Sequence, residues 1–565
     1  MPQENFQSEE GEQTFAIPDF TGGVNTYQHY NKAHINTLRK AKNAVYSKSG
    51  YVVRRPGFQQ LGGEFAAADT CLTILGAGSE DNRKLYIQYK SGTNRDVSAW
   101  NGSLWYTSDL AGSSADTDFP CDGSWVREES GSEFVYMANG SAPIGKYPVG
   151  STATDIDVAD GAAAFIPTNN DEPEEMGRTL TSFQGRLWYG GFVNAEHQQR
   201  DSLFYTDVLI PEKGGWNQAV NVLKFDGEVI VAVRPFKNNL LMVGTDVSIY
   251  LVAIGESLDF LDWQILKVSN DIGVGSVGSL SQGRDDYFFV DNAGNARQLK
   301  ITLTDFSGGV EPIPMSFPIK DQLDLLAGDN EGDKSRIDYM VGSFNDGKYL
   351  LNGRNGTLDG TTGQGWCYDS YQGGVWTGPM TYVATSLDDD TGSNVTAMNT
   401  VSSGFGFSTA FFKNRQTRTY LGIYSEVDTK MVIGYLDPTI YQDDDDEATA
   451  RNISVEVETQ FQDFGLPHLD KIVKTIEVEY GDEESGFSGT GSFEVLGRRD
   501  FASTWDYLDT VTYDANTKIS SAFINCLTLG RGRVFQFRFV DQSATNGPRL
   551  RRMWLRFQTF PAKNA

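Results

Sequence analysis

Hydrophobic and polar residues form a repeating pattern along the first three quarters of the chain. Each repeat has an apolar, aromatic strand, a turn of Gly, Asn or Asp, and a second strand, and strand centres recur at intervals of 47 to 62 residues. The centres are Leu85, Phe134, Leu187, Leu240, Tyr287 and Tyr349, with a possible further copy around Phe411. One such hairpin cannot bury both faces of its sheet, so a period of about fifty residues predicts stacked blades of a β-propeller. An elongated meander of hairpins would give a similar pattern.

Strict alternation of apolar and polar residues begins at Ile453 and predicts a second β module. The strand ISVEVETQF places Val455, Val457 and Thr459 on one face. The strand KIVKTIEVEY is expected to place Ile472, Lys474, Ile476 and Val478 on one face, opposite Val473, Thr475, Glu477 and Glu479. At least five such strands indicate an antiparallel β-sandwich with one wet face. Its core is expected to include Phe535, Phe537 and Phe539.

Polar segments flank and interrupt these patterns. Residues 1–19 are acidic and polar, and we expect an arm that becomes ordered only on contact with a partner. Residues 150–177 and 385–400 are expected to be surface loops inserted in the repeat. The acidic run from Gln442 predicts a linker, because adjacent carboxylates repel one another. The predicted division is an arm (1–19), an N-terminal docking segment (20–62), a propeller-like domain (63–440), an acidic linker (441–452) and a platform-like sandwich (453–565).

Composition supports a mainly β, soluble chain. Sixty glycines supply turns, and an aromatic content of 12% suits half-buried pleated surfaces. No apolar run approaches the roughly 20 residues that cross a bilayer, and no export signal is visible. The four cysteines lie far apart without CxxC spacing and are expected to be buried free thiols; they are Cys71, Cys121, Cys367 and Cys526.

Candidate chemistry is sparse. The four histidines, His29, His34, His197 and His468, have no second metal ligand at a suitable spacing. The acidic clusters at 388–390 and 443–447 lack the spaced ligands of a calcium loop and favour solvated loops. A sialidase-type turn motif survives only in degraded form as SYQGGVW from Ser370, with Gln372 where Asp is needed. The sequence therefore predicts no enzyme and no catalytic, cofactor or metal site.

Charge is distributed unevenly. A net charge of −28 disfavours general attraction to nucleic acid. An acidic protein can still let DNA slide past without retaining it, and acidity that serves only solubility is an equal alternative. Two basic zones stand out, one near each end of the chain, and arginine clusters suit docking onto an acidic protein ring. Nucleic-acid binding by Trp554 among arginines is the weaker alternative. The docking candidates are Arg39, Lys40, Lys42, Arg54, Arg55, Arg531, Arg533, Arg552 and Arg556.

The segment from Phe20 to Gly62 carries a recognisable order of motifs. It has a GGVN start, a basic middle rich in Ala and Asn, and an RPG corner in which Pro56 fixes its own φ and Gly57 can adopt a positive φ. This order resembles the N-terminal segment of the tail nozzle, or tail tubular B, proteins and of the tail hub proteins of short-tailed bacteriophages (podophages).

The middle of the chain adds to the resemblance. A Gly-Arg-Leu strand with a following Gly-Gly, a Ser-containing strand leading to Trp, and a Gly/Ser turn before an aromatic strand occur in the family order over about 120 residues. The matching segments are SFQGRLWYGG from Ser182, the stretch from Asp201 to Trp216, the strand pair from Val231, the stretch from Asn270, and GRGRVFQFRF near the C-terminus. The acidic arm and the loop lengths depart from the family pattern.

The resemblance implies a structural virion protein of the phage tail, assembled in the host cytoplasm. Family members form a hexameric ring below the head–tail adaptor, continue the DNA ejection channel and anchor fibres or spikes. The implied partners are therefore five further copies, the adaptor ring, tail fibre or spike proteins, and genomic DNA that passes without specific binding; no membrane span and no cofactor are implied. The alternatives are a propeller-type glycan-binding or glycan-hydrolysing surface protein and a secreted adhesion module.

Overall fold

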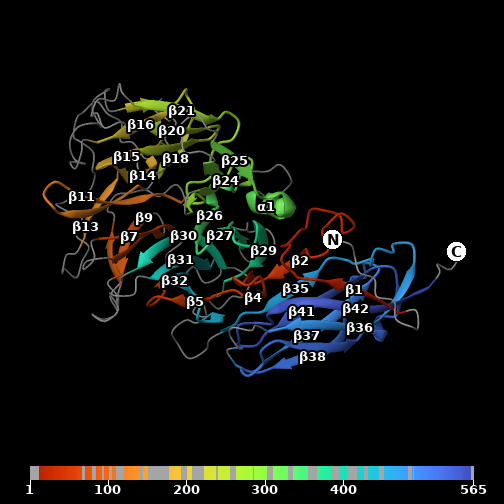
Figure 1. The fold of residues 1–565 in the computed structure, drawn as a ribbon. Helices are drawn as coiled ribbons and strands as arrows, with labels where there is room; N and C mark the ends of the chain where they lie inside the picture. The colour runs from red at the N-terminus through yellow and green to blue at the C-terminus, as the bar shows by residue number, and fades with distance from the viewer. Residues whose placement is uncertain are drawn as a thin grey trace.

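The chain folds into two β units that share a hydrophobic core (Figure 1). The structure is a computed structural model that describes residues 12–66, 70–78, 84–91, 94–100, 105–109, 120–138, 144–149, 177–192, 200–206, 222–236, 239–254, 263–283, 286–301, 310–328, 335–353, 365–382, 393–403, 416–425, 430–443, 451–481, 487 and 489–560. The fold is mainly β, with a β-propeller-like domain and an antiparallel sandwich, as the sequence predicts.

The propeller-like domain consists of antiparallel sheets that follow one another along the chain, seven within the described residues. The strands of the first four sheets are β7 (Thr70–Ala77), β8 (Lys84–Ser91), β9 (Asn94–Trp100) and β10 (Trp105–Asp109); β11 (Gly123–Arg127), β12 (Glu133–Met137) and β13 (Gly145–Pro148); β14 (Gly177–Phe183), β15 (Arg186–Phe192), β16 (Ser202–Tyr205) and β17 (Val222–Lys224); and β18 (Ile230–Phe236), β19 (Leu240–Thr245), β20 (Ile249–Ala253) and β21 (Gln264–Ser269).

The remaining three sheets follow the same up-and-down order. Their strands are β22 (Ser281–Gln282), β23 (Tyr287–Val290), β24 (Ala296–Ile301) and β25 (Val310–Pro314); β26 (Val341–Asn345), β27 (Lys348–Asn352), β28 (Gly365–Asp369) and β29 (Val375–Met380); and β30 (Ser393–Ser403), β31 (Gln416–Ser425) and β32 (Lys430–Asp437). Between the fifth and sixth sheets lie η3 (Phe317–Ile319), α1 (Lys320–Ala327) and η4 (Ile337–Tyr339). No helix among the described residues is long and apolar enough to cross a membrane.

The sheets close into a ring. Residues in or next to the first strand of every sheet line a single cavity, and β30 of the last sheet packs beside β7 of the first. Two N-terminal strands, β5 (Gly57–Gln60) and β6 (Phe65–Ala66), pair with β32 and complete the seventh sheet. The ring is thus closed by strands from the other end of the domain, which is a seven-bladed β-propeller in the described residues.

The predicted repeat agrees with these sheets. Each of the six strand centres lies on the second strand of its sheet, namely β8, β12, β15, β19, β23 and β27. The region around Phe411 lies outside the described residues, as do residues 150–176 of the predicted loop 150–177 and residues 385–392 of the predicted loop 385–400. The loop prediction is wrong for residues 393–400, which belong to β30. The period is visible in the sequence because each hairpin carries its own turn and its own buried strand.

The second unit is a sandwich of two sheets. One has the order β3-β4-β42-β36-β39, with β1 on β42 and β40 on β36; the other has the order β2-β35-β41-β37-β38. The strands are β1 (Glu12–Ile17), β2 (Leu38–Lys42), β3 (Ala44–Tyr46), β4 (Val52–Arg54), β35 (Val455–Thr459), β36 (Asp470–Tyr480), β37 (Gly491–Arg499), β38 (Asp506–Tyr513), β39 (Ser520–Asn525), β40 (Arg531–Gly532), β41 (Phe535–Asp541) and β42 (Leu550–Phe560), with η6 (Leu527–Leu529) beside them.

The core of the sandwich matches one prediction and corrects another. Phe535, Phe537 and Phe539 are fully buried, as expected. In β36, however, Val473 is fully buried with Ile476 and Val478, and Ile472 is not. The prediction that Ile472 shares a face with Ile476 and Val478 is therefore wrong in the first half of the strand. A register shift between Val473 and Thr475 explains the difference, because a bulge inverts which side chains point inward.

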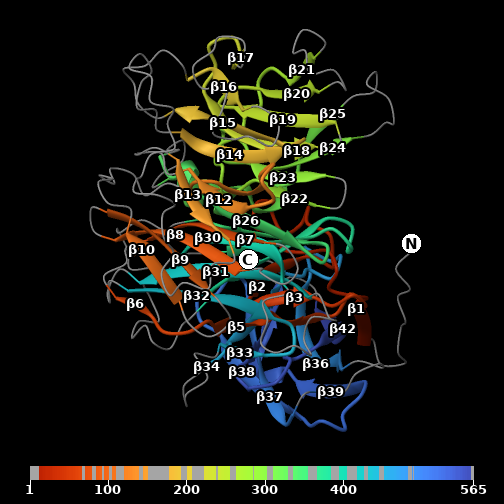
Figure 2. The ribbon, with the colours of Figure 1, turned by 90° about the vertical axis from the view of Figure 1, so that its left-hand side faces the viewer.

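Three predicted boundaries also need correction. The predicted arm 1–19 is ordered by its own chain in residues 12–17, which form β1 on the edge of β42. Residues 20–62 are not a separate docking segment: they supply β2 to β4 of the sandwich and β5 of the propeller. Figures 1 and 2 show these red strands among the blue strands of the sandwich and beside the propeller. The predicted linker 441–452 holds a short ladder of β33 (Gln442–Asp443) and β34 (Arg451–Asn452), while 444–450 lie outside the described residues.

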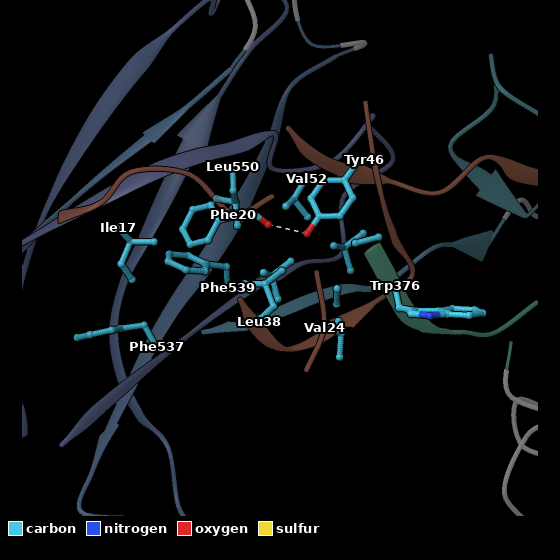
Figure 3. Packing of buried hydrophobic residues seen from close by; sticks show 14 of the residues in the cluster. Ile17, Phe20, Val24, Leu38, Tyr46, Val52, Trp376, Phe537, Phe539 and Leu550 are labelled. Carbon is cyan, nitrogen blue, oxygen red and sulfur yellow. Dashed lines mark hydrogen bonds between the residues drawn. The ribbon is translucent and has the colours of Figure 1, made fainter. Parts of the chain in front are cut away.

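The shared core lies where the N-terminal segment meets the sixth sheet of the propeller. Phe20, Val24 and Leu38 are buried in one cluster with Trp376 of β29 and Phe539 of β41, as Figure 3 shows. The Tyr46 hydroxyl donates a hydrogen bond of 2.5 Å to the carbonyl of Phe20, which fixes the chain at this point. Apolar burial across the boundary therefore couples the propeller to the sandwich.

Candidate functional site

Arg54 is a buried structural residue. Its guanidinium forms an ion pair of 2.7 Å with Asp541, and both side chains are completely excluded from solvent. The same carboxylate accepts a hydrogen bond of 2.5 Å from the Tyr513 hydroxyl. The prediction that Arg54 docks onto a partner is therefore wrong for the folded chain, because its charge is already neutralised inside the sandwich.

Arg55 is buried at the boundary between the two units. It donates to both oxygens of Asp443 at 2.9 and 2.6 Å, and its guanidinium lies 4.5 Å from the ring centroid of Tyr382. The amide of Phe58 in β5 donates to the same carboxylate at 2.9 Å. Arg55 was also predicted to dock, and this too is wrong, since it clamps the predicted linker to the strand that closes the propeller.

Gly57, the last residue of the RPG corner, has a different role from the expected one. Its φ is not positive, and it begins strand β5. A Cβ atom at this position would lie 2.1 Å from the carbonyl oxygen of Gln442. Glycine is thus required here for close approach of two backbones rather than for a left-handed turn.

Four of the remaining docking candidates pair with acidic residues of their own chain. Lys40 lies 2.7 Å from Glu456, and Arg552 lies 2.7 Å from Glu479. Arg531 and Arg533 lie 2.9 and 3.2 Å from the two oxygens of Asp470. These pairs are partly exposed, so they leave the side chains at the surface while reducing the net positive charge they present.

Arg39, Lys42 and Arg556 complete the predicted set, and the structure does not bring all nine residues together. Arg39 is exposed on β2 and donates a hydrogen bond of 2.6 Å to the carbonyl of Thr26. Lys42 is half-buried at the end of β2. Arg556 is exposed on β42 and borders a shallow depression of about 280 Å³ with Trp554, Glu477, Thr14 and Glu12. The two basic zones are therefore separate surfaces on the two sheets of the sandwich.

Sequence reasoning missed the cavity on the propeller axis. It has a volume of about 420 Å³ and is lined by residues of all seven sheets. Arg234 of β18 donates two hydrogen bonds of 2.6 Å to the carboxylate of Asp122, which also accepts from the Thr179 hydroxyl at 2.7 Å. Burial works to lower the pKa of Arg234, but the charge of Asp122, its hydrogen bonds and Tyr287 together raise that pKa. No local motif marks this pair, because its members are 112 positions apart.

The described part of the cavity offers little acid–base chemistry. Asp122 is the one carboxylate among its described lining residues, and Arg234 and Thr179 already occupy it. Hydrolysis of a glycosidic bond generally needs two carboxylates about 5 to 10 Å apart. A search of the described residues finds no group of three or more His, Cys, Asp or Glu able to hold a metal ion.

The degraded sialidase-type turn has a structural function. Asp369 accepts hydrogen bonds from the amides of Tyr371 and Gln372 at 2.9 and 3.2 Å and so holds the turn between β28 and β29. The Gln372 side chain donates to the carbonyls of Ser47 and Lys48 at 3.2 and 3.3 Å. The residue that departs from the motif thus ties the sixth blade to the sandwich hairpin of β3 and β4.

No protein-family model and no curated protein matches the chain. Among solved structures, it is similar to Raptor from Chaetomium thermophilum, at 9% identity and a TM-score of 0.41 over 69% of this chain and 29% of Raptor. It is also similar to the extracellular domain of a hybrid two component system from B. thetaiotaomicron (13% identity, TM-score 0.38, 76% of this chain and 44% of that one).

A third similar structure is an exo-beta-1,3-galactanase from Phanerochaete chrysosporium, at 8% identity and a TM-score of 0.25 over 77% of this chain and 95% of the galactanase. The chain spans less than half the length of the first two proteins. Similarity at this level identifies neither a family nor an activity for this chain.

Proposed function

We propose that the chain is a structural protein of the tail of a short-tailed bacteriophage, acting as a nozzle or tail tube ring below the head–tail adaptor. Six copies would enclose the channel through which DNA leaves the particle, and outward surfaces would anchor fibres or spikes. The adaptor ring and the fibre or spike proteins are the proposed partners, and DNA would pass without specific binding. The proposal rests on the motif resemblance together with the positions those motifs occupy.

The observation that carries the proposal is the role of the N-terminal motif segment as a joint. Phe20 and Val24 lie in the core shared by both units, Arg55 pairs with Asp443, and Gly57 begins the strand that closes the propeller. The C-terminal motif GRGRVFQFRF likewise supplies the buried phenylalanines of β41. Residues of the resemblance therefore build a stiff two-unit body, which suits a subunit of a tube wall.

The net charge of −28 supports the same role. Acidic groups facing a channel would repel phosphate, so DNA could move through the channel without being retained. We expect carboxylates to outnumber arginine and lysine along the bore of the assembled ring. A map of the ring with an arginine-lined bore would contradict this part of the proposal.

Electron microscopy tests the proposal directly. The purified full chain should form six-fold rings, alone or with a head–tail adaptor, and antibodies against the chain should label the tails of phage particles. A chain that remains a single particle under all these conditions and releases sugar from host polysaccharide would overturn the proposal in favour of a propeller-type glycan hydrolase. A single-particle chain that binds polysaccharide without cleaving it would instead favour a lectin.

A further inference from the structure

The cavity on the propeller axis has the size and setting of a small-molecule site. Its volume of about 420 Å³ lies within the range of roughly 300 to 1,000 Å³ that is usual for ligand pockets. Gln282 of β22 is exposed where it lines the cavity, so the cavity reaches the surface at this strand. Because residues of all seven sheets surround the cavity, a molecule inside it would be contacted from several blades at once.

The charges in the cavity are already matched. Arg234 and Asp122 are the charged residues among its described lining residues. Both terminal guanidinium nitrogens of Arg234 donate to the carboxylate at 2.6 Å, and the Thr179 hydroxyl and the amide of Leu180 donate to the same group at 2.7 and 3.2 Å. A charged ligand would have to break this pair or remain unpaired beside it, and both are costly in a partly buried site. The cavity therefore disfavours anions and cations.

Uncharged hydrogen-bonding groups remain available in the cavity. Thr181 of β14 lines it, is 7% exposed, and has a hydroxyl without a hydrogen-bond partner in the part of the chain that the structure describes. A buried hydroxyl is normally bonded, so a bound molecule or water must satisfy it. The Ser281 oxygen accepts from the amide of Phe344 at 2.8 Å and keeps its own proton to donate. The Asn399 amide nitrogen donates to the carbonyl of Ile74 at 2.7 Å, and its oxygen can still accept.

The wall of the cavity also contains apolar side chains. Ile74, Leu280 and Met398 line it and are buried. A pyranose ring has hydroxyl groups around its rim and apolar C–H groups on its two faces. A wall that combines a few hydroxyl and amide groups with apolar side chains complements such a ring, because the apolar surface is covered while the polar groups fix the orientation of the ligand.

We propose that the axial cavity binds a neutral sugar of hexose size, with Thr181, Ser281 and Asn399 hydrogen-bonding to its hydroxyl groups. The sugar would be held without being cleaved, because Asp122 is the one carboxylate among the described lining residues and is already bonded. This inference goes beyond the proposed tail role and does not rest on it, since neither a ring of subunits nor a DNA channel requires a ligand inside each propeller.

Saturation-transfer NMR with the full chain tests the site. Glucose, galactose and mannose are the probes, and at least one of them should bind with a dissociation constant of about 0.1 to 10 mM, the range expected for a small ligand held by a few uncharged groups. The uronate of the sugar that binds has the same ring and carries a negative charge at neutral pH. It should bind at least about tenfold more weakly than the neutral sugar, because the Arg234–Asp122 pair leaves no unmatched charge for it.

Thr181→Val removes the hydroxyl and keeps the shape of the side chain. It should raise the dissociation constant of the sugar about three- to tenfold, the usual effect of losing one hydrogen bond. Thr512→Val is the matched control, because Thr512 is exposed on β38 of the sandwich, far from the cavity lining, and its loss should leave binding unaltered. Thermal unfolding of each variant confirms that the fold is kept.

Three results would overturn the inference. One is that none of the three hexoses gives saturable binding, which would mean that the cavity holds water only. The others are binding that is unchanged in Thr181→Val, and a uronate that binds as tightly as its neutral sugar.

The outcomes are distinct from those for the tail role. Antibody labelling of phage tails without sugar binding would overturn this inference and leave the tail role standing. Sugar binding that depends on Thr181, by a chain that is absent from phage tails, would leave the inference standing and overturn the tail role.

Discussion

At the scale of residues, basic side chains in this protein divide into buried clamps and surface groups. Arg54 and Arg55 are adjacent in sequence, yet each is paired with an aspartate of a different unit, Asp541 in the sandwich and Asp443 beyond the propeller. Adjacent arginines near a chain end suggest a docking patch. Their actual partners lie 487 and 388 positions away, so the sequence offers no local sign of the pairing.

Arg55→Ala should lower the free energy of unfolding by roughly 3 to 5 kcal/mol, because it leaves the carboxylate of Asp443 buried without its partner. Urea unfolding measures the loss. The control is Arg533→Ala, whose side chain is 60% exposed in its pair with Asp470, and which should cost no more than about 1 kcal/mol. Equal losses for the two variants would show that Arg55 does not clamp the boundary.

The cysteines give a second prediction at this scale. All four are buried thiols outside any disulfide bond, as the sequence predicts, and burial raises the pKa of Cys71, Cys367 and Cys526 to about 12. Only about one in ten thousand of these thiols would be ionised at pH 8, so they should not react with thiol reagents in the folded chain. Mass spectrometry after labelling should detect them only after unfolding in urea. A Ser521→Cys variant, exposed on β39, should react at once and serves as the positive control.

At the scale of elements, strand β5 determines whether the propeller is a closed ring. It pairs with β32 from Gly57 to Gln60 and buries Phe58 completely. The hairpins themselves could be predicted from the sequence because each is local. This closing pair could not, since its strands come from opposite ends of the domain and a four-residue strand carries little periodic signal.

Phe58→Ala should destabilise the ring by about 3 to 5 kcal/mol through the cavity it leaves in the seventh sheet. Hydrogen exchange should then become faster in β32 and in β7 of the neighbouring sheet than in the sandwich. Phe523→Ala, at a side chain 60% exposed on β39, is the matched control and should change neither stability nor exchange measurably. Unchanged protection of β32 in the Phe58 variant would mean that β5 is dispensable for closure.

The bulge in β36 allows a test of which side chains of this strand point inward. Regular alternation would place Ile472 inward, whereas the structure buries Val473 and leaves Ile472 half-buried. Val473→Lys should therefore cost about 3 kcal/mol or more by burying an unpaired charge, and Ile472→Lys much less. The urea midpoints of the two variants measure these losses of stability. A larger loss for Ile472→Lys than for Val473→Lys would show that β36 alternates regularly and has no bulge.

At the scale of the whole molecule, the two units form one body rather than two domains on a linker. The N-terminal segment contributes strands to both, and a single hydrophobic cluster extends from β29 of the propeller to β41 of the sandwich. The fold class could be predicted from periodicities, but this interlock could not, because it depends on contacts between segments hundreds of residues apart. Because the core is continuous, a destabilising substitution in the propeller should also destabilise the sandwich.

Trp376→Ala tests that coupling. Trp376 belongs to the propeller and is 1% exposed. Its indole nitrogen donates a hydrogen bond of 2.8 Å to the carbonyl of Met315. Its ring lies in the hydrophobic cluster that includes Val24 and Leu38. Its loss should cost about 3 to 5 kcal/mol and should speed hydrogen exchange in β2 and β35 of the sandwich as well as in β29.

Trp188→Ala is the matched control for Trp376→Ala. Trp188 is also completely buried, but it lies in the third sheet, in a cluster confined to the third and fourth blades and their connections. Its removal should speed exchange in β15 and β18 and leave β2 and β35 unchanged. If both variants leave the sandwich protected, the two units unfold independently and the shared core does not couple them. If only Trp376→Ala speeds exchange in the sandwich, the boundary couples the two units, as the proposed role in a tube wall would require.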